Sequence, residues 1–227
     1  MHVVETPHPP GAVCMATGEI ARFATSLQCY HRLQVPNGSL DAWHAGVLVA
    51  ENLNHGLEAM MAMPSLQWAW IMGDDHVYPA DLLLRLLDRG VDVVAPLCLN
   101  RYPPLDPSIM TPSGQKHLED LPTSGLYKLG TGETCGDAGL LIRRNVLEAL
   151  ERPFYDRLRS GSFKSEDQAF TGKLQDSGFA IWIDMEHTIG HIAASAVQPV
   201  VKNGRWAIRL TGGAKHIIDI EPKRAPA

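Results

Sequence analysis

The apolar and polar positions of this chain follow two alternating patterns. Short apolar runs bounded by glycine, proline or polar residues are typical of buried strands, and they occupy residues 12–16, 68–72, 91–97, 138–142 and 179–183. Between them, apolar residues recur every three or four positions, which predicts helices over residues 20–33, 47–61, 80–87, 145–150 and 166–177. This alternation predicts a layered α/β protein with a mixed, mostly parallel sheet flanked by helices.

Two stretches depart from the alternation. Residues 100–132 contain several prolines and glycines without a sustained period, which predicts a long functional loop, one that we expect to order over a bound substrate. Near the end of the chain, Asn203-Gly204 lies between apolar flanks and predicts a β-hairpin. We therefore expect one domain over residues 1–195, extended by a hairpin and tail over residues 196–227, with a frayed end at 222–227.

The composition excludes several classes of protein. The chain has 227 residues, 45% of them apolar and 20% charged, as in globular proteins rather than disordered or fibrous ones. The net charge is −5 and no basic block occurs, which predicts no surface for nucleic acid or an anionic membrane. No apolar run approaches the ~20 residues of a membrane helix. Residues 1–10 lack the apolar run of a secretory signal, and the four cysteines are widely spaced, so we expect a reduced, cytoplasmic protein.

The sharpest chemical feature is Gly73-Asp74-Asp75-His76, directly after the apolar run at 68–72. Ligands of open α/β sheets bind at the carboxyl ends of the strands. Asp74 and His76 alternate along an extended backbone, so both side chains can face one ligand, and a carboxylate with an imidazole suits Mn²⁺, with Mg²⁺ as the second choice. The alternative is an aspartate that caps the next helix.

Two further clusters carry candidate chemistry. Ser165-Glu166-Asp167-Gln168 opens a predicted helix, where a serine cap and acids in the first turn are ordinary; a carboxylate there can also deprotonate a hydroxyl nucleophile. His187 and His191 are four residues apart, but the order is not H-E-x-x-H, and Gly190 argues against a helix. We expect His191, rather than His187, to complete a metal site with Asp74 and His76.

In order, these motifs resemble those of GT-A glycosyltransferases, the nucleotide-diphosphosugar transferases, and family two in particular. The likeness spans residues 12–195 and includes Ala16-Thr17-Gly18, Ala50-Glu51-Asn52, residues 68–76, Pro79-Ala80-Asp81, residues 135–144, Ser165-Glu166-Asp167-Gln168 and Ile189-Gly190-His191. It implies a single-domain GT-A fold and the transfer of a sugar from a nucleotide-diphosphosugar donor to a hydroxyl acceptor, which can be a glycan, a lipid-linked molecule or a protein.

The resemblance also assigns roles to residues. Asp74, His76 and His191 would bind Mn²⁺ or Mg²⁺, and Glu166-Asp167 would supply the catalytic base of inverting members, with Asp167 as the first candidate. The donor-binding residues would be Ala16, Thr17, Gly18, Glu51, Asn52, Asp74, Asp75 and Gly136. The leaving nucleoside diphosphate needs a cation to neutralise its charge, and the acceptor hydroxyl needs a carboxylate to remove its proton.

One departure from the family keeps alternatives open. Glu51 stands where many relatives carry arginine and cannot attract a diphosphate; Arg101, Lys164 or Arg205 could take over that role. A sugar-nucleotide-forming nucleotidyltransferase shares the general fold, but it would need a glycine-rich basic loop after the first strand, where this chain has only Thr17-Gly18-Glu19. A catalytically inactive nucleotide- or glycan-binding domain is the third hypothesis.

Overall fold

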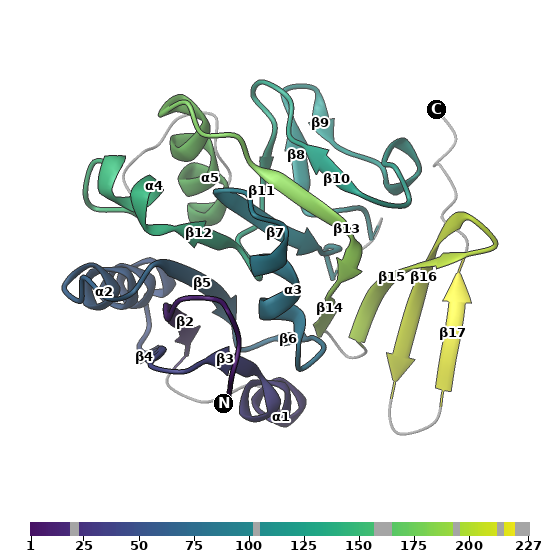
Figure 1. The fold of residues 1–227 in the computed structure, drawn as a ribbon. Helices are drawn as coiled ribbons and strands as arrows, with labels where there is room; N and C mark the ends of the chain where they lie inside the picture. Colours follow the sequence, from purple (N-terminus) through teal and green to yellow (C-terminus); the bar gives the residue numbers. More distant parts are fainter. Residues whose placement is uncertain (19–22, 102–104, 157–164, 193–195, 213–215, 221–227) are drawn as a thin grey trace.

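The apolar runs assemble into a central sheet (Figure 1). The computed structural model describes residues 1–18, 23–101, 105–156, 165–192, 196–212 and 216–220. Within these residues the central sheet has seven strands, in the order β10 (Leu126–Lys128), β13 (Trp182–Thr188), β7 (Val93–Leu97), β12 (Leu141–Arg143), β5 (Trp68–Gly73), β2 (Ala12–Thr17) and β4 (Leu40–Ala45).

The mixed α/β class is confirmed, whereas a mostly parallel sheet is not. β13 pairs with β7 in parallel, and β5, β2 and β4 are parallel neighbours. β10 and β12 run the other way, so three of the six neighbouring pairs described in this sheet are antiparallel. The sequence predicted the strand at β12 but not its direction, because apolar periodicity is the same in both directions.

Helices cover both faces of the sheet because its strands are apolar on both sides. Cys14 and Ala16 of β2 belong to a buried cluster with α2 (Val49–Met61), α4 (Arg144–Ala149) and α5 (Glu166–Asp176). Val13 and Met15 face the opposite cluster, with α1 (Ala24–Arg32) and α3 (Leu82–Asp88). All five predicted helices are present, although the start predicted for the first lies partly outside the described residues.

A second sheet lies beside the first at one end of the molecule (Figure 1). Its five described strands are, in order, β17 (His216–Ile220), β16 (Arg205–Gly212), β15 (Ala196–Lys202), β14 (Gly190–Ile192) and β6 (His76–Val77). The predicted hairpin is confirmed: β15 and β16 are joined at Asn203-Gly204, both with positive φ (55° and 71°). The predicted frayed end at 222–227 lies outside the described residues.

Gly190 permits the close approach of β14 to β6. A Cβ atom at this position would lie 2.5 Å from Val77 Cγ2, a spacing that real Cβ atoms essentially never show, so the strands would have to shift or Val77 to move. With glycine there, Gly190 pairs with Val77 and His191 stands directly opposite His76. Two residues 115 positions apart in the sequence thus become cross-strand neighbours.

The stretch predicted as a long loop, residues 100–132, contains short ordered elements instead. β8 (Ile109–Thr111) pairs with β9 (Gly114–Gln115) and β11 (Thr134–Cys135), and the 3₁₀ turn η1 (Leu118–Asp120) and β10 follow. Leu118, Leu121 and Leu129 are buried in the core, and the Trp206 indole donates a hydrogen bond to the Leu121 carbonyl at 3.2 Å. Elements of two or three residues are too short to produce a detectable period, and for that reason the sequence pattern missed them.

Two remaining points complete the architecture. β1 (His2–Val4) pairs in parallel with β3 (Gln34–Pro36) in a small separate sheet. Among the helices that the structure describes, none combines the length and the apolar character needed to cross a membrane.

Candidate functional site

The carboxyl ends of β2 and β5 bring the first predicted site residues together. Thr17 closes β2, and its hydroxyl donates to Asp74 Oδ2 at 2.5 Å; both side chains are buried. Asn52 of α2 donates to the carbonyls of Thr17 and Gly46, each at 3.2 Å, and so fixes the turn after β2. Asp74 is therefore anchored to the turn that the sequence assigned to the donor.

Asp75 lies between charged and titratable partners. Its Oδ1 is 3.0 Å from His76 Nδ1, and its Oδ2 is 2.7 Å from Arg101 Nη1 and 3.4 Å from His191 Nε2. Burial alone would raise the pKa of Asp75, but its interactions with the His191 and His76 imidazoles hold it well below its usual range. The carboxylate in contact with both imidazoles is thus that of Asp75. The predicted role of Asp74 as a metal ligand stays a prediction.

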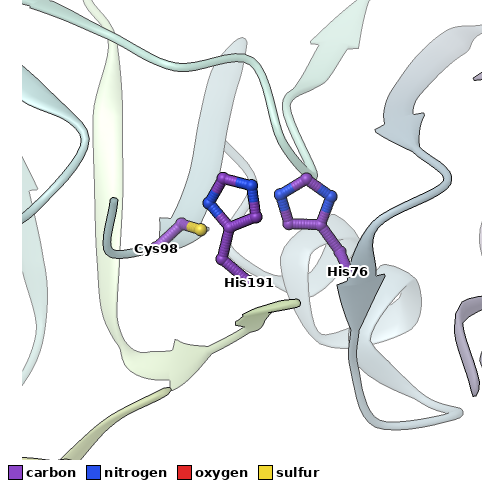
Figure 2. Close-up of side chains that lie close together, drawn as sticks. All are labelled: His76, Cys98 and His191. Carbon is purple, nitrogen blue, oxygen red and sulfur yellow. The ribbon is translucent and has the colours of Figure 1, made fainter. Parts of the chain in front are cut away.

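The two predicted histidines are joined by a cysteine that the sequence analysis did not assign to the site. Figure 2 shows the rings of His76 and His191 side by side, with the Cys98 thiol on the far side of His191. The ring centroids are 4.6 Å apart with an interplanar angle of 22°. One potential ligand atom from each of the three residues lies within 4.8 Å of the other two. Burial, reinforced by the charge of Asp75, raises the pKa of Cys98 to about 12, so this thiol is neutral near neutral pH.

A second group of carboxyl side chains, Asp137 and Asp167, lies near the Asp74-Asp75-His76 segment. The Tyr155 hydroxyl donates a hydrogen bond to Asp137 Oδ2 at 2.6 Å, and the backbone N–H of Gln168 donates one to Asp167 Oδ1 at 2.8 Å. Burial, together with the charge of Asp167, raises the pKa of Asp137 to about 7. Burial also raises the pKa of Asp167, against hydrogen bonds from Ser165 and Gln168. These carboxyl groups hold protons more readily than ordinary aspartates do.

Two adjacent cavities connect these groups. The larger, of about 310 Å³, is lined by Ala16, Gly18, Asp74, Asp75, His76, Arg101, Asp137, Ser165, Glu166 and Asp167, among others. The smaller, of about 150 Å³, is lined by His76, Cys98, Asn100, Ser108, Gly136, Asp137, Asp167 and His191, among others. His76, Asp137 and Asp167 line both cavities. The predicted metal-binding and base residues therefore meet around these cavities with most of the predicted donor-binding residues, whereas Thr17, Glu51 and Asn52 line neither cavity.

Glu51 is exposed at the start of α2 and lines neither cavity. Of the three basic residues considered in its place, Arg101 lines the larger cavity and Arg205 lies at the hairpin, lining a separate one. Lys164 lies outside the described residues.

His187 belongs to a different network from His191. Its Nδ1 lies 2.7 Å from Asp184 Oδ2, and Arg89 donates to the same carboxylate at 2.7 and 2.9 Å. This ion-paired group ties α3 to β13.

The comparisons with known proteins show the fold alone. No family model and no curated protein matches the sequence. Forty-three chains of solved structures resemble the fold. One is the crystal structure of A197 from STIV, with a TM-score of 0.59 and 13% sequence identity over 93% of this chain and 98% of that chain. At this identity the likeness supports a shared chain topology and says nothing of shared chemistry.

Proposed function

We propose that this protein transfers a sugar from a nucleotide-diphosphosugar donor to a hydroxyl acceptor, with the help of a divalent cation, on a GT-A fold. The observation that carries the proposal is the 310 Å³ cavity, which is lined by the Asp74-Asp75-His76 segment and by Glu166 and Asp167. Cation-dependent transfer with inversion needs both groups, one beside the leaving diphosphate and one beside the attacking hydroxyl, whereas a retaining enzyme would not need the base there.

The cation-binding role of the first group is supported by unsatisfied donor atoms. His76 Nδ1 is buried, 3.0 Å from Asp75 Oδ1, and no hydrogen bond satisfies it. His191 Nδ1 lies 3.1 Å from the Leu99 carbonyl, and the tautomer that donates to this carbonyl would present Nε2 to a cation. Asp75, His76 and His191 would thus hold the cation. When bound, the cation neutralises the negative charge that develops on the leaving nucleoside diphosphate.

The donor would lie along the turn after β2. Ala16 and Gly18 line the cavity there and leave room for a flat nucleobase, while the Thr17 hydroxyl fixes Asp74. Arg101 lines the same cavity beside Asp75, and its guanidinium suits a diphosphate. We assign to Arg101 the role that Glu51 cannot perform.

Asp167 would act as the base. Burial raises its pKa, which brings its proton affinity closer to that needed to accept a proton from a hydroxyl near neutral pH. Its Oδ1 accepts a hydrogen bond from the backbone N–H of Gln168, so the carboxylate has a fixed direction at the first turn of α5. The hydroxyl of the acceptor would give its proton to Asp167 as its oxygen attacks the anomeric carbon on the side opposite the diphosphate.

The test is a panel of nucleotide sugars with a divalent cation, in which release of nucleoside diphosphate is measured with and without added acceptors. We expect one donor to be cleaved slowly without an acceptor, and Asp74→Ala and His191→Ala to abolish that release. Pyrophosphate release from a nucleoside triphosphate and a sugar phosphate would overturn the proposal in favour of a nucleotidyltransferase. Nucleotide-sugar binding without turnover under every condition would overturn it in favour of an inactive binding domain.

A further inference from the structure

Three chain segments deliver one potential metal ligand each to the same place. His76 opens β6, His191 lies in β14 directly opposite it, and Cys98 follows the last residue of β7. Their ligand atoms lie within 4.8 Å of one another, and Figure 2 shows the three side chains converging. A tetrahedral Zn²⁺ holds nitrogen and sulfur ligands at about 2.0–2.3 Å, which places them roughly 3.5 Å apart. A bound Zn²⁺ would therefore draw these ligand atoms closer together.

The chemistry of this donor set differs from what the sequence predicted. Mg²⁺ prefers an all-oxygen shell with near-ideal octahedral geometry. Thiolate ligands select Zn²⁺ and other soft cations, and imidazoles bind Zn²⁺ well. Two imidazoles and a thiol therefore fit the Mn²⁺ or Mg²⁺ expected from Asp74, His76 and His191 less well than they fit Zn²⁺.

The surroundings of the cluster also suit a bound cation. His76 and Cys98 are 6% and 7% exposed, and His76 Nδ1 is an unpartnered buried nitrogen. The Leu99 carbonyl next to His191 Nδ1 is the kind of outer partner that fixes the tautomer of a metal-binding histidine. Asp75 contacts both imidazoles and is the nearest carboxylate available as a further ligand.

We propose that His76, Cys98 and His191 form a thiolate-containing site that binds Zn²⁺ in preference to Mn²⁺ and Mg²⁺, with the fourth position taken by Asp75 or by a phosphate oxygen of the donor. The Cys98 thiol gives its proton to the solvent as its sulfur binds the cation. The part of this inference that concerns the donor rests on the proposed function. The identity of the protein ligands and of the cation does not.

The test uses the full-length protein stripped with a chelator and no nucleotide. Zn²⁺, Mn²⁺ and Co²⁺ are titrated into the wild type, Cys98→Ala and Cys14→Ala; Cys14 is an equally buried cysteine in β2 that lines neither cavity of the site. We expect one Zn²⁺ per chain, bound at least about a hundredfold more tightly than Mn²⁺. Co²⁺ should give a thiolate-to-cobalt charge-transfer band in the wild type and in Cys14→Ala.

Cys98→Ala should lose that band and about a hundredfold or more of Zn²⁺ affinity, because removing a direct ligand costs at least as much as removing an outer partner. Its Mn²⁺ affinity should change little. His191→Ala provides a second variant should Cys98→Ala fold poorly, as judged by circular dichroism. Unchanged Zn²⁺ affinity in Cys98→Ala, or Co²⁺ binding to the wild type without the thiolate band, would overturn the inference.

Failure of the proposed zinc site and failure of the proposed glycosyl transfer give different experimental results. A protein that binds Zn²⁺ through Cys98 but cleaves no nucleotide sugar keeps the metal site and loses glycosyl transfer. A protein that cleaves a nucleotide sugar with Mn²⁺ and shows no thiolate band keeps the transfer and loses the zinc site.

Discussion

The two sides of the cavity use the same residue type in opposite electrostatic settings. Asp75 contacts His76, His191 and Arg101, and the two imidazoles hold its pKa well below its usual range against the effect of burial. Across the cavity, burial raises the pKa of both Asp137 and Asp167, and the charges of neighbouring carboxylates add to the effect. The anionic side, with Asp75, is thus permanently charged and suited to a cation. The proton-accepting side, with Asp137 and Asp167, can exchange a proton near neutral pH. Paired carboxyl groups with separated proton affinities are a recurring arrangement of acid–base active sites.

The largest effect is expected at the proton-accepting side. Asp167→Asn keeps the size of the side chain but removes its ability to accept a proton. We expect donor binding to persist and the transfer rate to fall by roughly two to four decades. The control is Asp176→Asn, an exposed aspartate at the other end of α5. An unchanged transfer rate in Asp167→Asn would remove this residue from the mechanism.

The pH dependence of stability tests the same side. The pKa of Asp137 is raised to about 7 in the folded protein, above its value of 3.8 in an unfolded chain. Its contribution to stability is therefore complete below the unfolded pKa and is lost as the pH rises through about 7. Asp137→Asn removes this pH-dependent loss. Relative to the wild type, the free energy of unfolding of the variant should therefore rise by roughly 3 kcal/mol between pH 4 and pH 8.

Denaturant unfolding of both proteins across that pH range measures the difference. Asp176→Asn again serves as the control and should follow the wild type. If the stability difference between Asp137→Asn and the wild type does not change with pH, the buried carboxyl group does not carry the proton that the account assigns to it.

The anionic side should respond through cation affinity. Asp75→Asn keeps the shape but removes the charge beside both imidazoles, and we expect divalent-cation affinity to fall about tenfold to a hundredfold. Asp88→Asn, an exposed aspartate at the end of α3, should leave it unchanged. Calorimetric titration of the chelator-treated proteins measures these cation affinities. Equal affinities in Asp75→Asn and the wild type would show that Asp75 links His76, His191 and Arg101 without contributing to cation binding.

The smallest effect is expected from the hydroxyl that joins the proton-accepting side to the core. Tyr155→Phe removes the hydrogen bond to Asp137 and leaves the ring stacked on Phe170. We expect a loss of about 1 kcal/mol in the free energy of unfolding. Because the hydroxyl partner favours the charged form of Asp137, the transition in stability near pH 7 should also move to higher pH.

The two sides also differ in how far the sequence could predict them. Asp74-Asp75-His76 was predictable because a fully apolar strand, β5, ends directly before it, and ligands bind at such strand ends. Acids in the first turn of a helix are ordinary, and Asp167 was singled out through the resemblance of Glu166-Asp167 to the acidic pair of the glycosyltransferases. Cys98 carries no local signal: its role depends on the pairing of β6 with β14, which Gly190 permits and which links residues far apart in the sequence.

The fold likewise contains elements that the sequence pattern predicts and others that depend on tertiary pairing. Long periodic elements such as α2 and β2 were predicted closely. β4 was not, because Asp41 and His44 interrupt its apolar positions, and only its pairing with β2 makes it a strand. The reversed direction of β12 likewise depends on tertiary pairing with β5 and β7.

The most direct measurement is a crystal structure of the protein with a nucleoside diphosphate and Zn²⁺, with the cation located by its anomalous scattering. We expect the diphosphate in the 310 Å³ cavity beside Asp75 and Arg101, and the cation between His76, Cys98 and His191, with Asp167 across from them. A nucleotide in the separate 550 Å³ groove lined by Lys128, Gly130 and Phe179, or a cation away from the two imidazoles, would contradict it.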